Sequence, residues 1–282
     1  MKASVQINPE TTAGETFARN RAIGRIALDV KGIGGKTRRA RVYEDGSLRV
    51  RFPNSHTERC EAVLVNTAGG MTGGDHFGLD LTAGTNASLI VTTAAAEKVY
   101  RSNGPNTTID VRMHAEQGAA IAWLPQETIL FDRARLSRRI EVDLAANASI
   151  LLAEAVVFGR AAMREIVRSG RLIDRWRIRR DGRLIFAESI RLEGAIADTL
   201  AKRAVAAGNS AVATLVMAPA GDVQLAAVRE LGDRLMGEVG ASSWNGLAVV
   251  RLCAKDGARL RHDLIMVLSA LSPHPLPRLW LN

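Results

Sequence analysis

The chain repeats a short pattern at intervals of roughly 30 residues, and no other feature limits the possible folds as strongly. Each copy consists of a Gly or Asn turn, a short apolar run and a polar residue at the end of the run. The copies are NASLIVTT (86–93), GAAIAWLPQE (118–127), NASILLAE (147–154) and GRLIFAE (182–188), with Leu89, Ile121, Ile150 and Leu184 taken as equivalent. A period of this length in an extended pattern predicts stacked coils, that is, a superhelical, β-helix-like fold, although a β-rich chain also yields such matches by chance.

Segments in which apolar and polar side chains alternate extend from about residue 24 to about residue 218. Such alternation is typical of half-buried strands, so we predict a mainly β protein. The clearest segments are 48–52, 62–66, 77–81, 87–93, 108–114, 139–144 and 150–158. Asp181-Gly182 separates two further runs, 175–180 and 183–189, and a two-residue link of this kind predicts a hairpin.

The C-terminal third has a different periodicity. Apolar residues at helical spacing predict an amphipathic helix over 225–236 and favour a second helix over 262–271, so we expect about two α-helices in this third. Residues 247–254 are expected to form a strand. The Pro-rich tail HPLPRLWLN is expected to be extended.

The formal net charge is +9, from 38 basic and 29 acidic residues. Such a surplus fits either a solvated surface or an acidic partner, such as nucleic acid, a membrane or an acidic protein. The arginines are spread along the chain, with neither a Lys-rich tail nor the interleaved aromatic residues that a base-stacking surface needs. A basic, β-rich nucleic-acid-binding protein is therefore an alternative that only the charge favours.

Signals for export or membrane insertion are not visible in the sequence. The polar segment 1–20 has no apolar core of a signal peptide, and no apolar run approaches the ~18–20 residues that span a bilayer. The distant Cys60 and Cys253 do not form a disulfide framework. We therefore expect a cytoplasmic protein with a mobile N-terminal arm over 1–20 and a single domain over 21–282.

The segment NTAGGMTGGD, residues 66–75, is rich in glycine. Gly-rich loops can bind phosphate through their backbone N–H groups, but this one lacks the G-K-[ST] of a P-loop and is followed by a strand-like pattern. We therefore predict a tight link between strands, in which glycine supplies positive φ angles. Asp75 and His76 at its end are candidate weak metal contacts.

The sequence contains no catalytic or tight metal-binding motif. The five histidines form no i, i+4 pair, the cysteines form no C-x-x-C, and there is no G-x-S-x-G elbow, so a hydrolase with a carboxylate site is a weak alternative. If the repeat is real, the polar ends of its copies stack and bring Glu127, Glu154 and Glu188 near a common axis. Carboxylates so placed are costly unless they are solvated, paired or used to hold a cation.

Five unusual stretches follow one another along the chain, and their combination is more specific than any one of them. They are NTAGGMTGGD (66–75), TTAAAEKVYRS (92–102), WLPQETILFDRARLSRR (123–139), FGRAAMRE (158–165) and WRIRRDGRLIFAESIRL (176–192). Together with the closing PRLW, they resemble the urease accessory protein D family, also called UreD or UreH, in order and spacing. The resemblance extends from about residue 20 to the end.

This resemblance implies a scaffold without enzymatic activity, built as a β-rich superhelical platform with a pair of helices. It implies that the chain binds apo-urease together with accessory proteins F and G, the latter a GTPase, and helps to deliver Ni²⁺ to the urease active site. Ni²⁺ would be in transit, with no tightly bound cofactor. Asp75, Glu154 and Glu188 fall at acidic positions like those proposed to line an internal polar path, and the repeat adds Glu127. Because His and Cys are scarce, such a path must use carboxylates and water, which fits transient binding.

Overall fold

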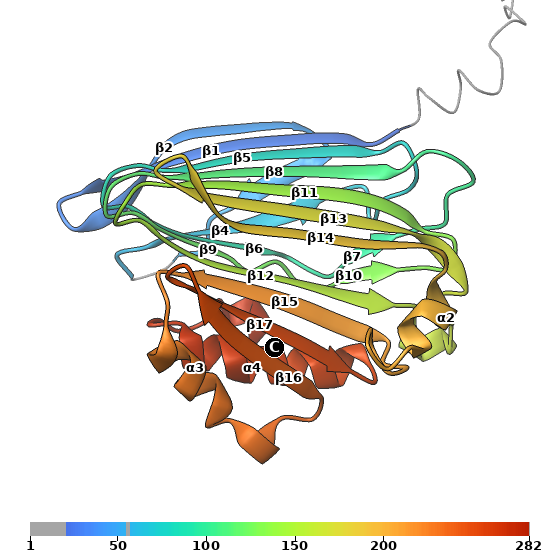
Figure 1. Ribbon diagram of the computed structural model, residues 1–282. Helices are drawn as coiled ribbons and strands as arrows, with labels where there is room; N and C mark the ends of the chain where they lie inside the picture. The colour runs from blue at the N-terminus through green and yellow to red at the C-terminus, as the bar shows by residue number, and fades with distance from the viewer. Residues whose placement is uncertain (1–20, 55–56, 282) are drawn as a thin grey trace, which may run out of the picture.

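The computed structural model describes residues 21–54 and 57–281. The predicted arm, residues 1–20, lies outside the described residues. The assignment of residues 21–282 to a single domain stays a prediction. Within the described residues, the chain forms a seven-stranded sheet and a ten-stranded sheet that lie face to face (Figure 1).

The seven-stranded sheet has the strand order β14-β13-β11-β8-β5-β1-β2. Its strands are β1 (Ile23–Ile33), β2 (Lys36–Gly46), β5 (His76–Ala83), β8 (Thr107–Ala115), β11 (Arg135–Leu144), β13 (Ser169–Arg180) and β14 (Arg183–Ala195). The ten-stranded sheet contains β3 (Leu48–Arg51), β4 (Cys60–Asn66), β6 (Ser88–Thr93), β7 (Glu97–Val99), β9 (Ala120–Trp123), β10 (Thr128–Leu130), β12 (Ser149–Phe158), β15 (Ala211–Ala218), β16 (Glu238–Trp244) and β17 (Leu247–Ala254).

Successive coils each place one strand in each sheet, which confirms the predicted β-helix-like architecture. Strands β5, β8, β11 and β13 pair in parallel in one sheet, and β4, β6, β9 and β12 do so in the other. Leu89 lies opposite Ile121, and Ile121 lies opposite Ile150, as the repeat predicts. Stacking of this kind lets each coil bury the apolar residues of its neighbours.

The fourth copy of the repeat was predicted wrongly. Leu184 lies on β14, which pairs antiparallel to β13 in the seven-stranded sheet, and its side chain is exposed. The reason is the hairpin at Asp181-Gly182, where both residues have positive φ angles of 47° and 76°. A two-residue turn of this kind reverses the chain at once, so GRLIFAE begins a return strand and not a new coil.

Two apolar cores separate the layers. The first lies between the two sheets and includes Leu28, Leu81, Met113 and Ile140. The second lies between the ten-stranded sheet and the C-terminal helices, which cover the face of that sheet turned away from the seven-stranded sheet (Figure 1).

The helical part of the described chain consists of α2 (Ile196–Ala201), α3 (Asp222–Arg229) and α4 (Gly257–Leu271), with short 3₁₀ turns at Ala161–Met163, Gly232–Arg234 and Arg278–Trp280. The helix predicted over 225–236 ends early because Gly232 adopts a φ of +45°. The helix predicted from residue 262 begins at Gly257, where Asp256 accepts a hydrogen bond from Arg259 N and caps the helix. The short α2 was not predicted. None of the helices in the described ranges is long and apolar enough to cross a membrane.

The Gly-rich segment is a tight link between β4 and β5, as predicted. Gly69, Gly70 and Gly74 have positive φ angles. Gly73 is needed for a different reason, because a Cβ atom there would lie 1.9 Å from Ser102 Oγ and 2.4 Å from Pro105 O. The glycines therefore let the link pass close to the turn that precedes β8.

Replacing Gly73 with alanine is expected to lower the free energy of unfolding by about 1–3 kcal/mol, because the added methyl group has no room. Gly104→Ala is the matched control, since nothing lies within 4 Å of a Cβ atom at that position. Urea unfolding of both variants measures the difference. Equal midpoints for the two variants would contradict this account of the link.

Candidate polar path through the core

A buried ionic network lies in the core between the two sheets. Arg138 comes from β11, Asp174 from β13 and Glu154 from β12, so the network joins both sheets. Arg138 Nε donates to Asp174 Oδ1 at 3.1 Å, Arg138 Nη2 donates to Asp174 Oδ2, and Arg138 Nη1 donates to Glu154 Oε2. The Arg138 side chain is only 3% exposed.

Two tryptophans complete the hydrogen bonding of this network. Trp123 Nε1 donates to Glu154 Oε1 at 2.8 Å, and Trp176 Nε1 donates to Asp174 Oδ1 at 2.8 Å. Each indole packs its apolar body into the core and directs its single N–H group at a carboxylate. All four carboxylate oxygens of Glu154 and Asp174 therefore accept a hydrogen bond.

The network shifts the protonation of its members. Burial raises the pKa of Glu154 to about 7, and nearby Asp174 adds to the rise, while Arg138 and the hydrogen bond from Trp123 oppose it. Burial acts to lower the pKa of Arg138, but Asp174 and Glu154 outweigh it, so that this pKa lies above its ordinary value. The guanidinium is therefore charged, and the two carboxylates around it compete for one positive charge.

A small cavity of about 60 Å³ adjoins the network. Apolar side chains form most of its wall, and Glu97 and Thr128 line it together with Glu154 and Arg138. Asn66 Nδ2 donates to Glu97 Oε2 at 3.0 Å, and burial raises the pKa of Glu97 more than this hydrogen bond lowers it. The cavity has room for a few water molecules or a partly hydrated ion.

A row of polar residues leads from the network to the open edge of the two sheets. Glu154 lies opposite Thr214 of β15, and Thr214 lies opposite Arg251 of β17. Directly opposed residues project from the same face of a sheet, so this row faces the seven-stranded sheet. Arg251 Nη2 donates to Glu188 Oε2 of β14 at 2.5 Å. The side chain of Arg251 is 60% exposed, which places this end of the row near solvent.

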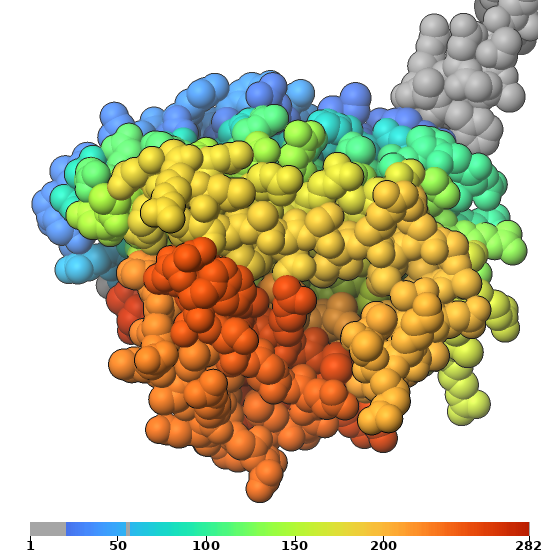
Figure 2. Space-filling view, viewed as in Figure 1, coloured from blue at the N-terminus to red at the C-terminus, as the bar shows by residue number. Residues whose placement is uncertain are grey.

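In Figure 2, the yellow surface of β13 and β14 borders the orange to red surface of the C-terminal segments. The Glu188–Arg251 pair joins β14 to β17 between these two parts of the chain. The polar row therefore connects a buried carboxylate pair with the edge of the molecule.

The four carboxylates predicted from sequence do not lie together. Glu154 and Glu188 belong to the row described above. Glu127 contacts Arg261 of α4 at 3.1 Å, on the helix-covered face of the ten-stranded sheet. The Asp75 carboxylate accepts hydrogen bonds from the backbone of Ala22 and Thr72, which stabilises the link before β5. The predicted stack of carboxylates about one axis is therefore wrong for Glu127.

Sequence reasoning did not identify Arg138, Asp174 or Glu97 as site residues. A signal for the first two exists in hindsight, because each interrupts the inward-facing apolar positions of its strand. Arg138 alternates with Leu136 and Ile140, and Asp174 with Leu172 and Trp176. Among the described residues, no group of three or more His, Cys, Asp or Glu side chains is placed to hold a metal ion.

The raised pKa of Glu154 predicts how stability depends on pH. The folded-state pKa of about 7 exceeds the unfolded value of roughly 4.3. The contribution of Glu154 to the free energy of unfolding is therefore fully present at low pH and is lost as the pH rises through 7. In the unchanged protein, this effect should lower the free energy of unfolding by a value on the order of 3 kcal/mol between about pH 4 and pH 8. Glu154→Gln cannot titrate and should not show this decrease. The variant also loses one hydrogen-bond acceptor and should begin from a lower stability. Urea unfolding of both proteins across this range gives the two slopes, and parallel curves would refute the prediction.

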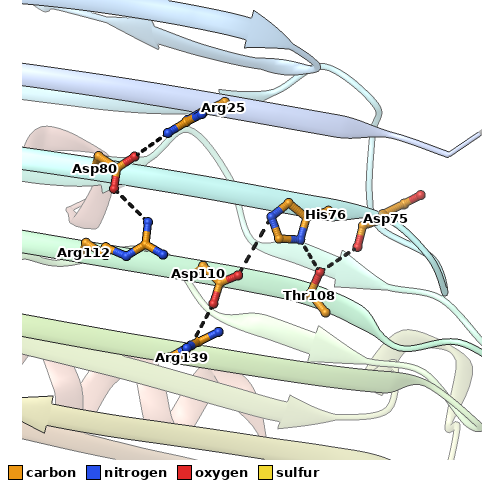
Figure 3. A network of polar contacts seen from close by, with 8 residues as sticks. All are labelled: Arg25, Asp75, His76, Asp80, Thr108, Asp110, Arg112 and Arg139. Atoms are coloured by element: carbon orange, nitrogen blue, oxygen red, sulfur yellow. Dashed lines mark hydrogen bonds and ion pairs between the residues drawn. The ribbon is translucent and has the colours of Figure 1, made fainter.

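The outer face of the seven-stranded sheet carries a separate ladder of charges (Figure 3). Asp80 contacts Arg25 at 3.3 Å and Arg112 at 3.2 Å, and Asp110 contacts Arg139 at 3.0 Å. His76 Nδ1 lies 2.6 Å from Thr108 Oγ1. On this part of the surface, acidic residues alternate with basic ones, whereas a surface that follows a phosphate backbone needs a continuous basic stripe. The nucleic-acid-binding alternative gains no support here and stays an untested prediction.

The fold and its interior define a class of protein: a β-superhelical platform with a polar row enclosed between its two sheets. Residues 22–281 match the family described as UreD urease accessory protein. Urease accessory protein UreD of Rhodopseudomonas palustris (strain HaA2) is 52% identical over 278 residues, covering 98% of this chain and 100% of the relative. Urease accessory protein UreD 3 of Bradyrhizobium sp. (strain BTAi1) is 50% identical, covering 99% and 100%. The chain therefore belongs to the UreD urease accessory protein family, as its motifs predicted.

Proposed function

We propose that this UreD-family protein helps to deliver Ni²⁺ to apo-urease, acting with accessory proteins F and G as a non-enzymatic scaffold in the cytoplasm. Family membership supports a role in urease maturation. The observation that carries the finer proposal is the polar row between the sheets. Glu154 and Asp174 are buried in a largely apolar core, and Glu188 lies at the end of the row near solvent.

Burying carboxylates is costly, so a fold that needed only a stable core would fill these positions with apolar residues. Carboxylate oxygens and water are ligands that a divalent cation accepts. A row without His or Cys would hold Ni²⁺ weakly, and weak binding allows release at the far end. We propose that Ni²⁺ passes along this row as cargo, through Glu188 at the edge, the Glu154–Asp174 pair in the centre and the cavity beside Glu97.

Binding to partner proteins is supported by exposed apolar side chains. Met163, Ile166, Val223, Met236 and Trp244 are large apolar residues with substantial exposure. Exposed apolar side chains that gather into patches mark protein contact sites, and the basic surplus favours acidic partners. These features fit a scaffold that works in a complex.

The test is activation of apo-urease in a mixture of Ni²⁺, bicarbonate, GTP and accessory proteins F and G, with and without this chain. We expect activation to require the chain and to fall on the order of tenfold or more with Glu154→Gln/Glu188→Gln, because two carboxylates of the row are lost. Glu141→Gln is the matched control, since Glu141 projects from the opposite face of β11 to Arg138.

Co-purification of each variant with the partner proteins separates assembly from transfer. Full activation by the double variant would rule out the path while leaving the scaffold role in place. Activation that is independent of the chain would rule out the proposed function altogether.

A further inference from the structure

Each carboxylate of the polar row is already paired with an arginine. Arg138 contacts both Glu154 and Asp174, and Arg251 contacts Glu188. At the central pair, Nε, Nη1 and Nη2 of Arg138 donate to three of the four carboxylate oxygens. Trp123 donates to the fourth, Glu154 Oε1, and Trp176 shares Asp174 Oδ1 with Arg138. A metal ion therefore cannot gain these oxygens as ligands while the guanidinium stays in place.

We propose that Arg138 is the resident cation of a carboxylate site made by Glu154 and Asp174, and that this site binds a divalent metal ion only after the guanidinium has been displaced. The role of this site in nickel transfer rests on the proposed function. The binding property itself belongs to this chain and can be measured without urease.

Charge balance supports the exchange. One guanidinium faces two carboxylates, whereas a divalent cation would balance both. A metal ion beside the guanidinium would be repelled by it, and this repulsion is strong inside a protein because the effective dielectric constant is low. Arginine and the metal ion are therefore alternative occupants of the same site.

The structure also offers the guanidinium another environment. Arg138 lines the cavity of about 60 Å³, and Glu97 and Thr128 line the same cavity. A guanidinium that left Glu154 and Asp174 would meet polar groups there and not only apolar side chains. A rotation of one side chain into this cavity would open the carboxylate pair.

The test is Ni²⁺ binding to the full chain and to Arg138→Met, which keeps the length of the side chain but removes its charge. Equilibrium dialysis gives stoichiometry and affinity, and thermal unfolding with NiCl₂ or with a chelator gives stabilisation. We expect Arg138→Met to bind one Ni²⁺ per chain on the order of tenfold or more tighter than the unchanged protein, and to unfold at a higher temperature with Ni²⁺ than with chelator.

Two further variants identify the site. Arg138→Met/Glu154→Gln/Asp174→Asn should lose the added Ni²⁺, because the carboxylates are gone. Arg139→Met removes the neighbouring arginine, which is exposed on the outer face and pairs with Asp110, and should bind Ni²⁺ no better than the unchanged protein. If Arg138→Met does not fold with or without Ni²⁺, the same measurements are made on Arg138→Gln, which retains hydrogen bonding to the carboxylates.

Two outcomes would overturn the proposal. One is a folded Arg138 variant with no gain in Ni²⁺ binding. Another is binding of one Ni²⁺ by the unchanged protein through Glu154 and Asp174, since Arg138 would then not keep the metal ion out of the carboxylate site. The activation assay distinguishes this proposal from the function it rests on: if Arg138→Met gains the metal site but activates urease normally, the exchange site is real and the path through it is not used.

Discussion

Replacing Trp280 with alanine is expected to lower the free energy of unfolding by about 3–5 kcal/mol, the range found for large aromatic residues in cores. Trp280 is 1% exposed and packs in the core between the ten-stranded sheet and α4. Its Nε1 donates to Leu124 O at 2.9 Å, and the guanidinium of Arg261 lies 5.2 Å from the ring centroid. The substitution therefore removes buried area, a hydrogen bond and a cation–π contact at once.

Leu281→Ala is the matched control, because Leu281 is the next residue along the chain and is 62% exposed. Urea unfolding of the two variants should give a large loss for the first and little change for the second. A small effect of Trp280→Ala would mean that the tail contributes little to the stability of the second core.

Asp174→Ala should be similarly damaging, with a loss of about 3–5 kcal/mol. It leaves Nε and Nη2 of Arg138 and Nε1 of Trp176 without their acceptor inside the core. The free-energy cost of leaving a buried charge unpaired is larger than the net stabilisation that the intact ion pair provides. The expected loss is therefore larger than the contribution of the Arg138–Asp174 contact itself.

Asp143→Ala serves as the control, because Asp143 is exposed on β11, the same strand that carries Arg138. Removing the whole charged set with Arg138→Met/Asp174→Leu/Glu154→Leu should restore part of the lost stability, since apolar residues of similar volume often replace buried ion pairs without penalty. Thermal unfolding compares the three proteins. If the triple variant is less stable than Asp174→Ala, the network contributes more to folding than electrostatics alone predicts.

The candidate site was only partly predictable from sequence. Glu154 and Glu188 were expected on an internal path, and the structure places both between the sheets, although nickel binding to them is untested. Asp75 was expected on the same path, and this stays a prediction; its carboxylate accepts hydrogen bonds from the backbone of Ala22 and Thr72. Glu127 was expected on the same axis, but it faces α4. The sequence shows which residues carry charge, but not which face of a strand meets which layer.

The sequence by itself determined the β-superhelical architecture. Strand alternation and a period of roughly 30 residues can both be seen along the chain without knowledge of its packing. They aligned Leu89, Ile121 and Ile150, which are opposite one another in the parallel strands of the structure. The hairpin at Asp181-Gly182 was also local, because two residues suffice to define such a turn.

Only the tertiary structure decided which buried charges meet. Arg138 and Asp174 lie 36 residues apart and become neighbours through parallel pairing of β11 with β13, while Glu154 reaches them from the opposite sheet. Contacts of this kind depend on the register of one coil on the next and on how two sheets pack face to face. Periodicity specifies that a residue points inward, but the identity of the group opposite it follows only from the packing of distant segments.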